Sequence, residues 1–210
     1  MSIKDIVKKS RSYRRFNEAH QINSAFLEEL IELARLSPSA SNKQPLKYLI
    51  YNTPSDCSVV FSCLKWAGYL DDWDGPEPGE RPSAYIIILG DKSISGSFGV
   101  DHGIVSQSIM LGAAEKGLGG CIIASVDRTR LRKELGIPEQ FEILLVLALG
   151  KPVERVILEE IKKGDIKYWR DTDKNYHVPK RPLDELIIKL SIPVLFCAVF
   201  RPPKCQPIDL

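Results

Sequence analysis

Amphipathic helical patterns and short apolar runs alternate in the first part of the chain. Residues 24–36, SAFLEELIELARL, place apolar side chains at intervals of three and four, which predicts an amphipathic helix. The run LKYLIYN at 46–52 is too short for a helix and predicts a buried strand. A threonine, a proline and an acid in the next turn then predict a helix over 54–66.

The middle of the chain continues this mixture. Residues 84–91, AYIIILGD, form an unbroken apolar and largely β-branched run, which predicts a central strand. Residues 100–117 carry small residues on several sides, which predicts a helix buried against other helices. Three further elements are expected: a strand starting at GGCII that enters a turn, a helix over 128–135 capped by Asp127, and a buried strand over 141–152. This order predicts an α/β or α+β fold.

Two stretches have no clear period. Residues 68–83 are rich in glycine and proline, and they predict a loop whose Tyr69 and Trp73 either line a pocket or only anchor the loop. The end of the chain has an apolar run too short to cross a bilayer, followed by several prolines. We therefore expect a main domain over 1–186 and an extension over 187–210, which either packs on a partner subunit or is peculiar to this chain.

Composition limits the function without defining it. The 210 residues are 44% hydrophobic, which suits one or two globular domains, and 29 Lys+Arg against 27 Asp+Glu leave no broad basic surface for nucleic acid. The N-terminal sequence lacks the apolar core of a signal peptide, so we expect a cytoplasmic protein that binds no membrane. Five cysteines without a C-x-x-C pair indicate neither a disulfide framework nor a metal site.

The loop SPSASNKQP, residues 37–45, crowds hydroxyl and amide side chains between a helix and a strand. A simple connection needs only a glycine or asparagine and a proline. These groups can donate and accept hydrogen bonds together. The loop is therefore either a long surface connection or part of a site for a polar ligand.

Two basic motifs suggest a phosphate site. The run SRSYRRF at 10–16 offers guanidinium groups and a hydroxyl, which can bind phosphate through charge-assisted hydrogen bonds or form a solvated basic face. Near the other end, Lys180 and Arg181 precede Pro182, which we expect to be the first residue of a helix. Two cations at a helix N-terminus oppose the helix dipole unless an anion lies between them, which favours a phosphate site.

Five motifs, in this order, resemble the nitroreductase family of flavoenzymes: RSYRRF, SPSASNKQP, DHGIVSQSIMLGAAEKGLGG, CIIASVD and VPKRPL. The resemblance extends from about residue 9 to residue 186. It implies an α+β fold with a central, mainly antiparallel sheet flanked by helices. It also implies an intertwined homodimer with two FMN sites at the subunit interface, where NADH or NADPH reduces the flavin.

The resemblance also implies roles for individual residues. In the loop, Ser39, Asn42 and Gln44 would hydrogen-bond the isoalloxazine edge or the ribityl chain, with Pro38 packed beside them. Groups from both ends of the chain would hold the phosphate and the ribityl end: Arg11, Ser12, Arg14, Lys180 and Arg181. The backbone amides of Ala124 and Ser125 would lie near flavin N5 and O4, where a donor stabilises negative charge on the reduced ring.

The implied reaction needs no catalytic side chain, and the sequence shows no acid–base pair and no nucleophile motif. Hydride would pass from NAD(P)H through flavin N5 to an electron-poor acceptor such as a nitroaromatic or a quinone, by ping-pong exchange. Tyr69 and Trp73 would line the acceptor pocket. The alternatives are a flavin-binding sensor without turnover, a relative that fragments flavin or performs reductive dehalogenation, and a plain nucleotide or phosphate binder.

Overall fold

The computed structural model describes residues 1–70, 73–162 and 164–190. Most of the expected extension over 187–210 therefore lies outside the described residues. Within them, no helix is long and apolar enough to cross a membrane.

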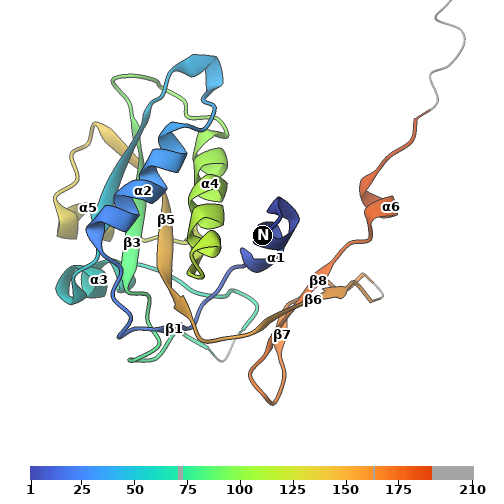
Figure 1. The fold of residues 1–210 in the computed structure, drawn as a ribbon. Helices are drawn as coiled ribbons and strands as arrows, with labels where there is room; N and C mark the ends of the chain where they lie inside the picture. Colours follow the sequence, from blue (N-terminus) through green and yellow to red (C-terminus); the bar gives the residue numbers. More distant parts are fainter. Residues whose placement is uncertain (71–72, 163, 191–210) are drawn as a thin grey trace, which may run out of the picture.

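A five-stranded antiparallel sheet forms the centre of the molecule (Figure 1). Strands β1, β5, β3 and β2 lie in this order, and β4 pairs with β5 beside β1. The strands are β1 (Phe16–Asn17), β2 (Leu46–Tyr51), β3 (Ala84–Asp91), β4 (Gly119–Ile123) and β5 (Phe141–Pro152). This sheet, together with the helices around it, confirms the α+β fold class.

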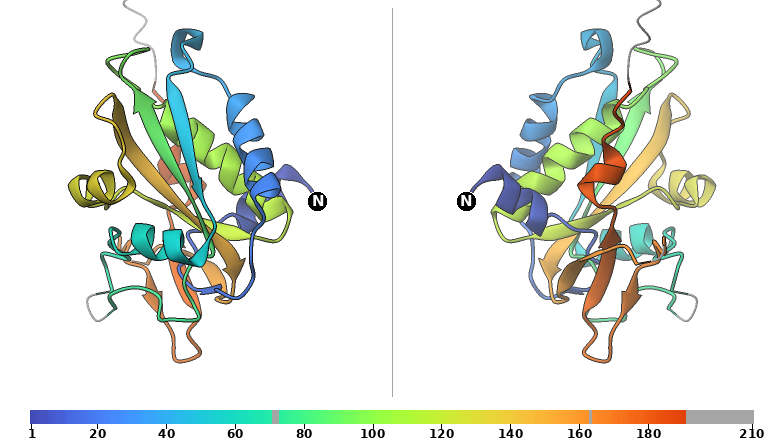
Figure 2. Two further views of the ribbon diagram at one scale, coloured as in Figure 1. Left: turned by 90° about the vertical axis from the view of Figure 1, so that its left-hand side faces the viewer. Right: turned by 90° about the vertical axis from the view of Figure 1, so that its right-hand side faces the viewer.

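Helices cover both faces of the sheet, as Figures 1 and 2 show. On one face lie α2 (Ser24–Arg35) and α4 (Asp101–Glu115), and on the other lie α3 (Pro54–Phe61) and α5 (Arg128–Leu135). Side chains of β3 alternate between the two cores: Ile86 packs toward α2 and α4, and Ile87 toward α3 and α5. Every residue of β3 is therefore buried, which explains its unbroken apolar run.

The ends of the helices follow local capping chemistry. The Thr53 side chain accepts a hydrogen bond from the Asp56 amide at the start of α3, and Asp127 caps α5 through the Arg130 amide. However, α3 ends at Phe61, five residues earlier than expected. The chain turns after Phe61, and the Lys65 amide then donates a hydrogen bond of 2.9 Å to the Ser125 carbonyl, beyond the end of β4.

Helix α4 is only half buried in the single chain. Val105, Ile109 and Ala113 pack into the core, whereas Ile104 and Gln107 on its other side are exposed. The expectation of a helix buried against other helices therefore holds for one face of α4 within this chain.

The hydrophobic pattern of the sequence did not predict the helices and strands near the two ends of the chain. These are α1 (Ile3–Lys9) and a second sheet made of β6 (Val156–Glu160), β7 (Trp169–Arg170) and β8 (Tyr176–Lys180). In this sheet β8 lies between β6 and β7. The last helix, α6 (Leu183–Leu186), has a single turn and is preceded by Pro182, so the expectation that Pro182 begins the helix was wrong. Figure 1 shows α6 standing away from the main body.

Candidate functional site

A cavity lies between the N-terminal segment, α4, β4 and the second sheet. We call it the arginine cavity, and its lining residues are Ser10, Arg11, Ser12, Arg14, Gln107, Met110, Ile122, Tyr168, Tyr176, Val178 and Lys180. Its cationic residues come from both ends of the sequence. The fold thus brings together two basic motifs that the sequence separates by more than 160 positions.

Two glycines allow the N-terminal segment to reach this position. The Tyr13 amide donates a hydrogen bond of 2.9 Å to the Gly120 carbonyl at the edge of β4. A Cβ atom on Gly119 would lie 2.5 Å from the Tyr13 ring, and one on Gly120 would lie 2.3 Å from the Ala148 carbonyl oxygen. The glycine pair is therefore a packing requirement of the strand that borders the cavity.

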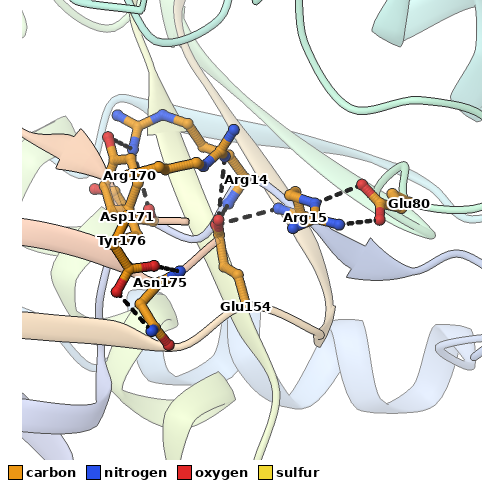
Figure 3. A network of polar contacts seen from close by, with 9 residues as sticks. Arg14, Arg15, Glu80, Glu154, Arg170, Asp171, Asn175 and Tyr176 are labelled. Atoms are coloured by element: carbon orange, nitrogen blue, oxygen red, sulfur yellow. Dashed lines mark hydrogen bonds and ion pairs between the residues drawn. The ribbon is translucent and has the colours of Figure 1, made fainter. Parts of the chain in front are cut away.

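A buried carboxylate fixes the same segment from the other side (Figure 3). Glu154, whose side chain is fully buried, accepts hydrogen bonds from the backbone N–H groups of Arg14 and Arg15. Its second oxygen accepts a hydrogen bond of 3.2 Å from the Arg170 guanidinium. Because Arg170 belongs to β7, Glu154 connects the N-terminal segment to the second sheet.

Aromatic side chains hold the Arg14 guanidinium. Its Nη1 donates to the Tyr176 hydroxyl at 2.6 Å, and its charge lies 5.0 Å from the centre of the Tyr168 ring. Burial raises the pKa of Tyr176, so the phenol keeps its proton. No carboxylate of the described residues forms an ion pair with Arg14, and its charge is therefore positioned without being neutralised.

The other predicted phosphate ligands divide into two groups. Arg11 lines the cavity, and its buried Nε has no hydrogen-bond partner among residues 1–70, 73–162 and 164–190. Lys180 lines the cavity at the end of β8. The Arg181 guanidinium instead pairs with Glu185 at 2.8 Å and does not line the cavity. The structure therefore brings together Arg11, Ser12, Arg14 and Lys180, but not Arg181.

The turn after β4 carries the two predicted backbone donors, neither of which is among the lining residues of the cavity. Ala124 and Ser125 are exposed and follow Ile122, which is one of the lining residues. Their amide N–H groups donate to no other group in the described parts of the chain. Both groups are thus available to a ligand.

The loop over 37–45 borders a different pocket, between α2, β2 and the start of α4. Pro38, Ser39 and Gln44 line it, and it shares no lining residue with the arginine cavity. The Ser39 hydroxyl donates to the buried carboxylate of Asp101 at 2.6 Å and accepts from the Gln44 amide at 2.9 Å. In this chain Ser39 therefore organises the loop.

The backbone of this loop is unusual. Ser41, Asn42 and Gln44 have φ angles of 52°, 52° and 51°, a region that side-chain-bearing residues seldom occupy. The Gln44 side-chain amide donates to the Asn42 side-chain oxygen at 3.1 Å. Asp101 stabilises this conformation, because its carboxylate accepts hydrogen bonds from both Ser39 and the Ala40 amide.

The two aromatic residues predicted for the acceptor pocket lie apart. The centre of the Tyr69 ring lies 4.9 Å from that of Tyr168, so Tyr69 contacts one residue that lines the arginine cavity. Trp73 instead faces the Arg170 guanidinium at 4.3 Å, in a separate depression. Neither Tyr69 nor Trp73 is among the lining residues of the cavity itself.

Sequence reasoning missed several residues of the site, above all Glu154, Tyr168 and Tyr176. Tyr176 lies in YHVPK, residues 176–180, where polar and apolar residues do not alternate and Pro179 argues against a strand, so no local pattern indicated its position. For Glu154 there was no local signal either, because its role depends on the backbone amides of Arg14 and Arg15. These residues lie 140 and 139 positions earlier in the sequence.

The chain is similar to known proteins over most of its length. The sequence model described as "Nitroreductase family" matches residues 7–57 and 81–151. A Bacillus subtilis protein named "Putative NAD(P)H nitroreductase MhqN" is 27% identical over 183 residues, which cover 70% of this chain and 86% of that protein.

Two solved structures show the same fold. An FMN-dependent nitroreductase from Clostridium difficile R20291 superposes with a TM-score of 0.58 at 22% identity, covering 80% of this chain and 92% of that one. A nitroreductase family protein from Streptococcus pneumoniae TIGR4 superposes with a TM-score of 0.63 at 16% identity. The match covers 90% of this chain and all of the other.

Proposed function

Because this chain belongs to the nitroreductase family and has its fold, we propose that it is an oxidoreductase that binds FMN and uses NADH or NADPH to reduce an electron-poor acceptor. The names of its relatives support this proposal, since one refers to NAD(P)H and another to FMN. Nitroaromatics and quinones are the acceptor classes that we propose. The observation that carries the proposal is the arginine cavity, with its gathered cations and the buried Arg11 Nε that has no partner among the described residues.

The residues of the cavity fit the phosphate of a flavin nucleotide. Arg11, Arg14 and Lys180 provide positive charge, and Ser12 adds a hydroxyl. The Arg11 Nε is a buried donor that lacks a partner within the described chain, and a buried donor without a partner is costly. A phosphate oxygen in the cavity would remove this cost.

The flavin ring would supply the hydride chemistry, and the protein would supply position and charge. We propose that the amides of Ala124 and Ser125 point toward N5 and O4 and stabilise the charge of the reduced ring. Tyr168 and Tyr176 hold Arg14 in place, and Glu154 keeps its backbone fixed. No side chain of this site has to transfer a proton for hydride exchange at the ring.

We further propose that two subunits share each flavin site. In one chain the loop over 37–45 and the arginine cavity form separate pockets, although both carry predicted flavin ligands. Apolar side chains at the end of the described chain also lack cover: Leu183, Leu186, Ile187, Ile188 and Leu190 are 55% to 86% exposed. A homodimer would cover these side chains and could bring the loop of one subunit to the cavity of the other.

The test is the visible spectrum of the purified protein, followed by addition of NADH or NADPH without oxygen. We expect bound flavin whose absorbance bleaches and returns when a nitroaromatic or a quinone is added. Bound flavin that does not bleach would support a sensor without turnover. A colourless protein that also fails to bind added FMN would refute the proposal.

A further inference from the structure

A small pocket lies on the α3 side of the sheet, away from both pockets described above. We call it the Arg81 pocket, and it is lined by Glu18, Gln21, Pro54, Cys57, Ser58, Phe61, Arg81, Pro82, Ser83 and Tyr85. It shares no lining residue with the arginine cavity or with the pocket of the 37–45 loop. The function proposed above leaves it unused.

Three buried polar atoms lack partners on the wall of this pocket. They are Arg81 Nε, Ser83 Oγ and the Tyr85 hydroxyl. Tyr85 is completely buried and Ser83 is 5% exposed, so bulk water does not compensate them. Seven buried side-chain atoms lack a partner in the described part of the chain, and three of them meet here. Such a concentration indicates a ligand, because isolated buried donors are costly.

These groups form a donor set with a positive charge. The Arg81 guanidinium lies 4.3 Å above the Phe61 ring and forms no ion pair with any described residue. Burial raises the pKa of Tyr85 well above its usual value, so its hydroxyl keeps a proton to donate. A guanidinium and two hydroxyl groups lining one small pocket are suited to a carboxylate.

The pocket also has apolar lining, and the Arg81 guanidinium covers one face of the Phe61 ring. Phe61, Pro54 and Cys57 form this lining, and burial raises the pKa of the Cys57 thiol to about 11, so the thiol is uncharged at neutral pH. Glu18 also lines the pocket, and its carboxylate accepts a hydrogen bond from the Gly79 amide. The negative charge of Glu18 opposes any anion in the pocket, and it opposes a ligand with two negative charges more strongly than a monocarboxylate.

We propose that the Arg81 pocket binds a small monocarboxylate, with its carboxylate on Arg81, Ser83 and Tyr85 and its alkyl group against Phe61. This site is separate from the flavin site and does not depend on the reaction proposed for it. Sulfate should bind poorly because of its second charge. Nitrate should bind less well than propionate, since it has no alkyl group to contact the apolar side chains of the pocket.

The test is the thermal stability of the full-length protein, saturated with FMN where FMN binds, in sodium chloride and in sodium propionate of equal ionic strength. A ligand of the folded state raises Tm with the logarithm of its concentration. We expect such a rise with propionate and with acetate at low millimolar concentrations, where the general stabilising effect of sulfate is small, and no such rise with sulfate. Equal Tm values in all four salts would refute the proposal.

Variants place the binding in this pocket. Tyr85→Phe removes one donor to the carboxylate, and we expect propionate to bind about tenfold more weakly or worse. In chloride alone, the same variant should be at least as stable as the wild type, because it removes a buried hydroxyl that has no partner among the described residues. Tyr51→Phe, in a partly buried position on β2, is the matched control.

Arg81→Gln supplies a second test, with Arg155→Gln as its control on an exposed arginine. Propionate should no longer stabilise the Arg81 variant, whereas the Arg155 variant should respond as the wild type does. If propionate raised the Tm of both Arg81→Gln and Tyr85→Phe as much as that of the wild type, propionate would bind elsewhere on the protein. The proposal would then fail.

Discussion

The guanidinium of Arg14 donates a hydrogen bond of 2.6 Å to the hydroxyl of Tyr176, across 162 positions of sequence. This contact joins the N-terminal segment to β8 at the wall of the arginine cavity. Glu154 stabilises the same junction, because its carboxylate accepts hydrogen bonds from the Arg14 backbone amide and from the Arg170 guanidinium. The position of the Arg14 charge therefore depends on three separate parts of the chain.

Arg14→Ala should weaken FMN binding. Loss of a charge-assisted hydrogen bond costs about 1.5 to 3 kcal/mol, which corresponds to an increase in Kd of roughly tenfold to 150-fold. Tyr176→Phe should have a smaller effect, because the charge remains and only its orientation is lost. Fluorescence titration of the FMN-free protein measures both effects, with Arg155→Ala as the control. An unchanged Kd in Arg14→Ala would rule out its assigned role.

The two neighbouring cations at the end of β8 should behave differently. Lys180 lines the arginine cavity, whereas Arg181 pairs with Glu185. Lys180→Ala should raise the Kd for FMN and make it less sensitive to salt, because one phosphate contact is lost. Arg181→Ala should change the Kd much less, since its ion pair with Glu185 is exposed. A larger effect in Arg181→Ala would mean that this side chain leaves Glu185 to bind the ligand.

The central sheet and its covering helices could be predicted because local patterns determine them. Strand β5 has the bounds expected for residues 141–152, and Asp127 caps α5 as its sequence indicates. The second sheet could not be predicted in this way. Its three strands are short, and β6 pairs with β8 across a connection of fifteen residues that carries no regular pattern.

The candidate site could be predicted only in part, for a similar reason. The motifs at 10–16 and 37–45 are local, so a resemblance can find them. Their arrangement is not local: Glu154 and Tyr176 position Arg14, and Asp101 positions Ser39. The pairing of Arg181 with Glu185 likewise depends on α6 forming one turn from Leu183.

A mixing experiment would test whether two subunits share each flavin site. Arg14→Ala impairs the cavity, and Asp101→Asn should impair the loop, because Asp101 accepts hydrogen bonds from Ser39 and Ala40. Each variant alone should bind FMN weakly. If the cavity and the loop of each site come from different subunits, a mixed dimer has one intact site and one site with both defects. Random exchange of equal amounts makes about half of the dimers mixed, so about a quarter of all sites should regain wild-type affinity.

The control for this experiment is a mixture of Arg14→Ala with Lys180→Ala. Both changes lie in the cavity of one chain, so every site of the mixed dimer keeps one defect or the other. No site of wild-type affinity should appear. Sites restored equally in both mixtures, or FMN bound tightly by a monomer, would contradict the shared site.

The second sheet should weaken as the pH rises through the pKa of His177. The ring of this residue lies between two carboxylates, 2.6 Å from Glu159 on β6 and 3.1 Å from Asp171 after β7, and it stacks on Trp169. Hydrogen bonding to Asp171, and then to Glu159, raises the pKa of His177 above 6.5. Hydrogen bonds from Asn175 and then His177 lower the pKa of Asp171 to about 2.

The signs of these shifts define a pH window. A raised histidine pKa stabilises the folded protein fully below the unfolded value of 6.5, and this contribution disappears as the pH rises through the folded value. A lowered aspartate pKa stabilises above the unfolded value of 3.8, and its contribution disappears as the pH falls toward about 2. The stability difference between the wild type and His177→Gln should therefore be largest between these two unfolded values. Urea unfolding from pH 4 to 9 measures this difference in the free energy of unfolding, with His20→Gln as the control. If the difference between the wild type and His177→Gln does not shrink at alkaline pH, His177 stabilises the sheet without its charge.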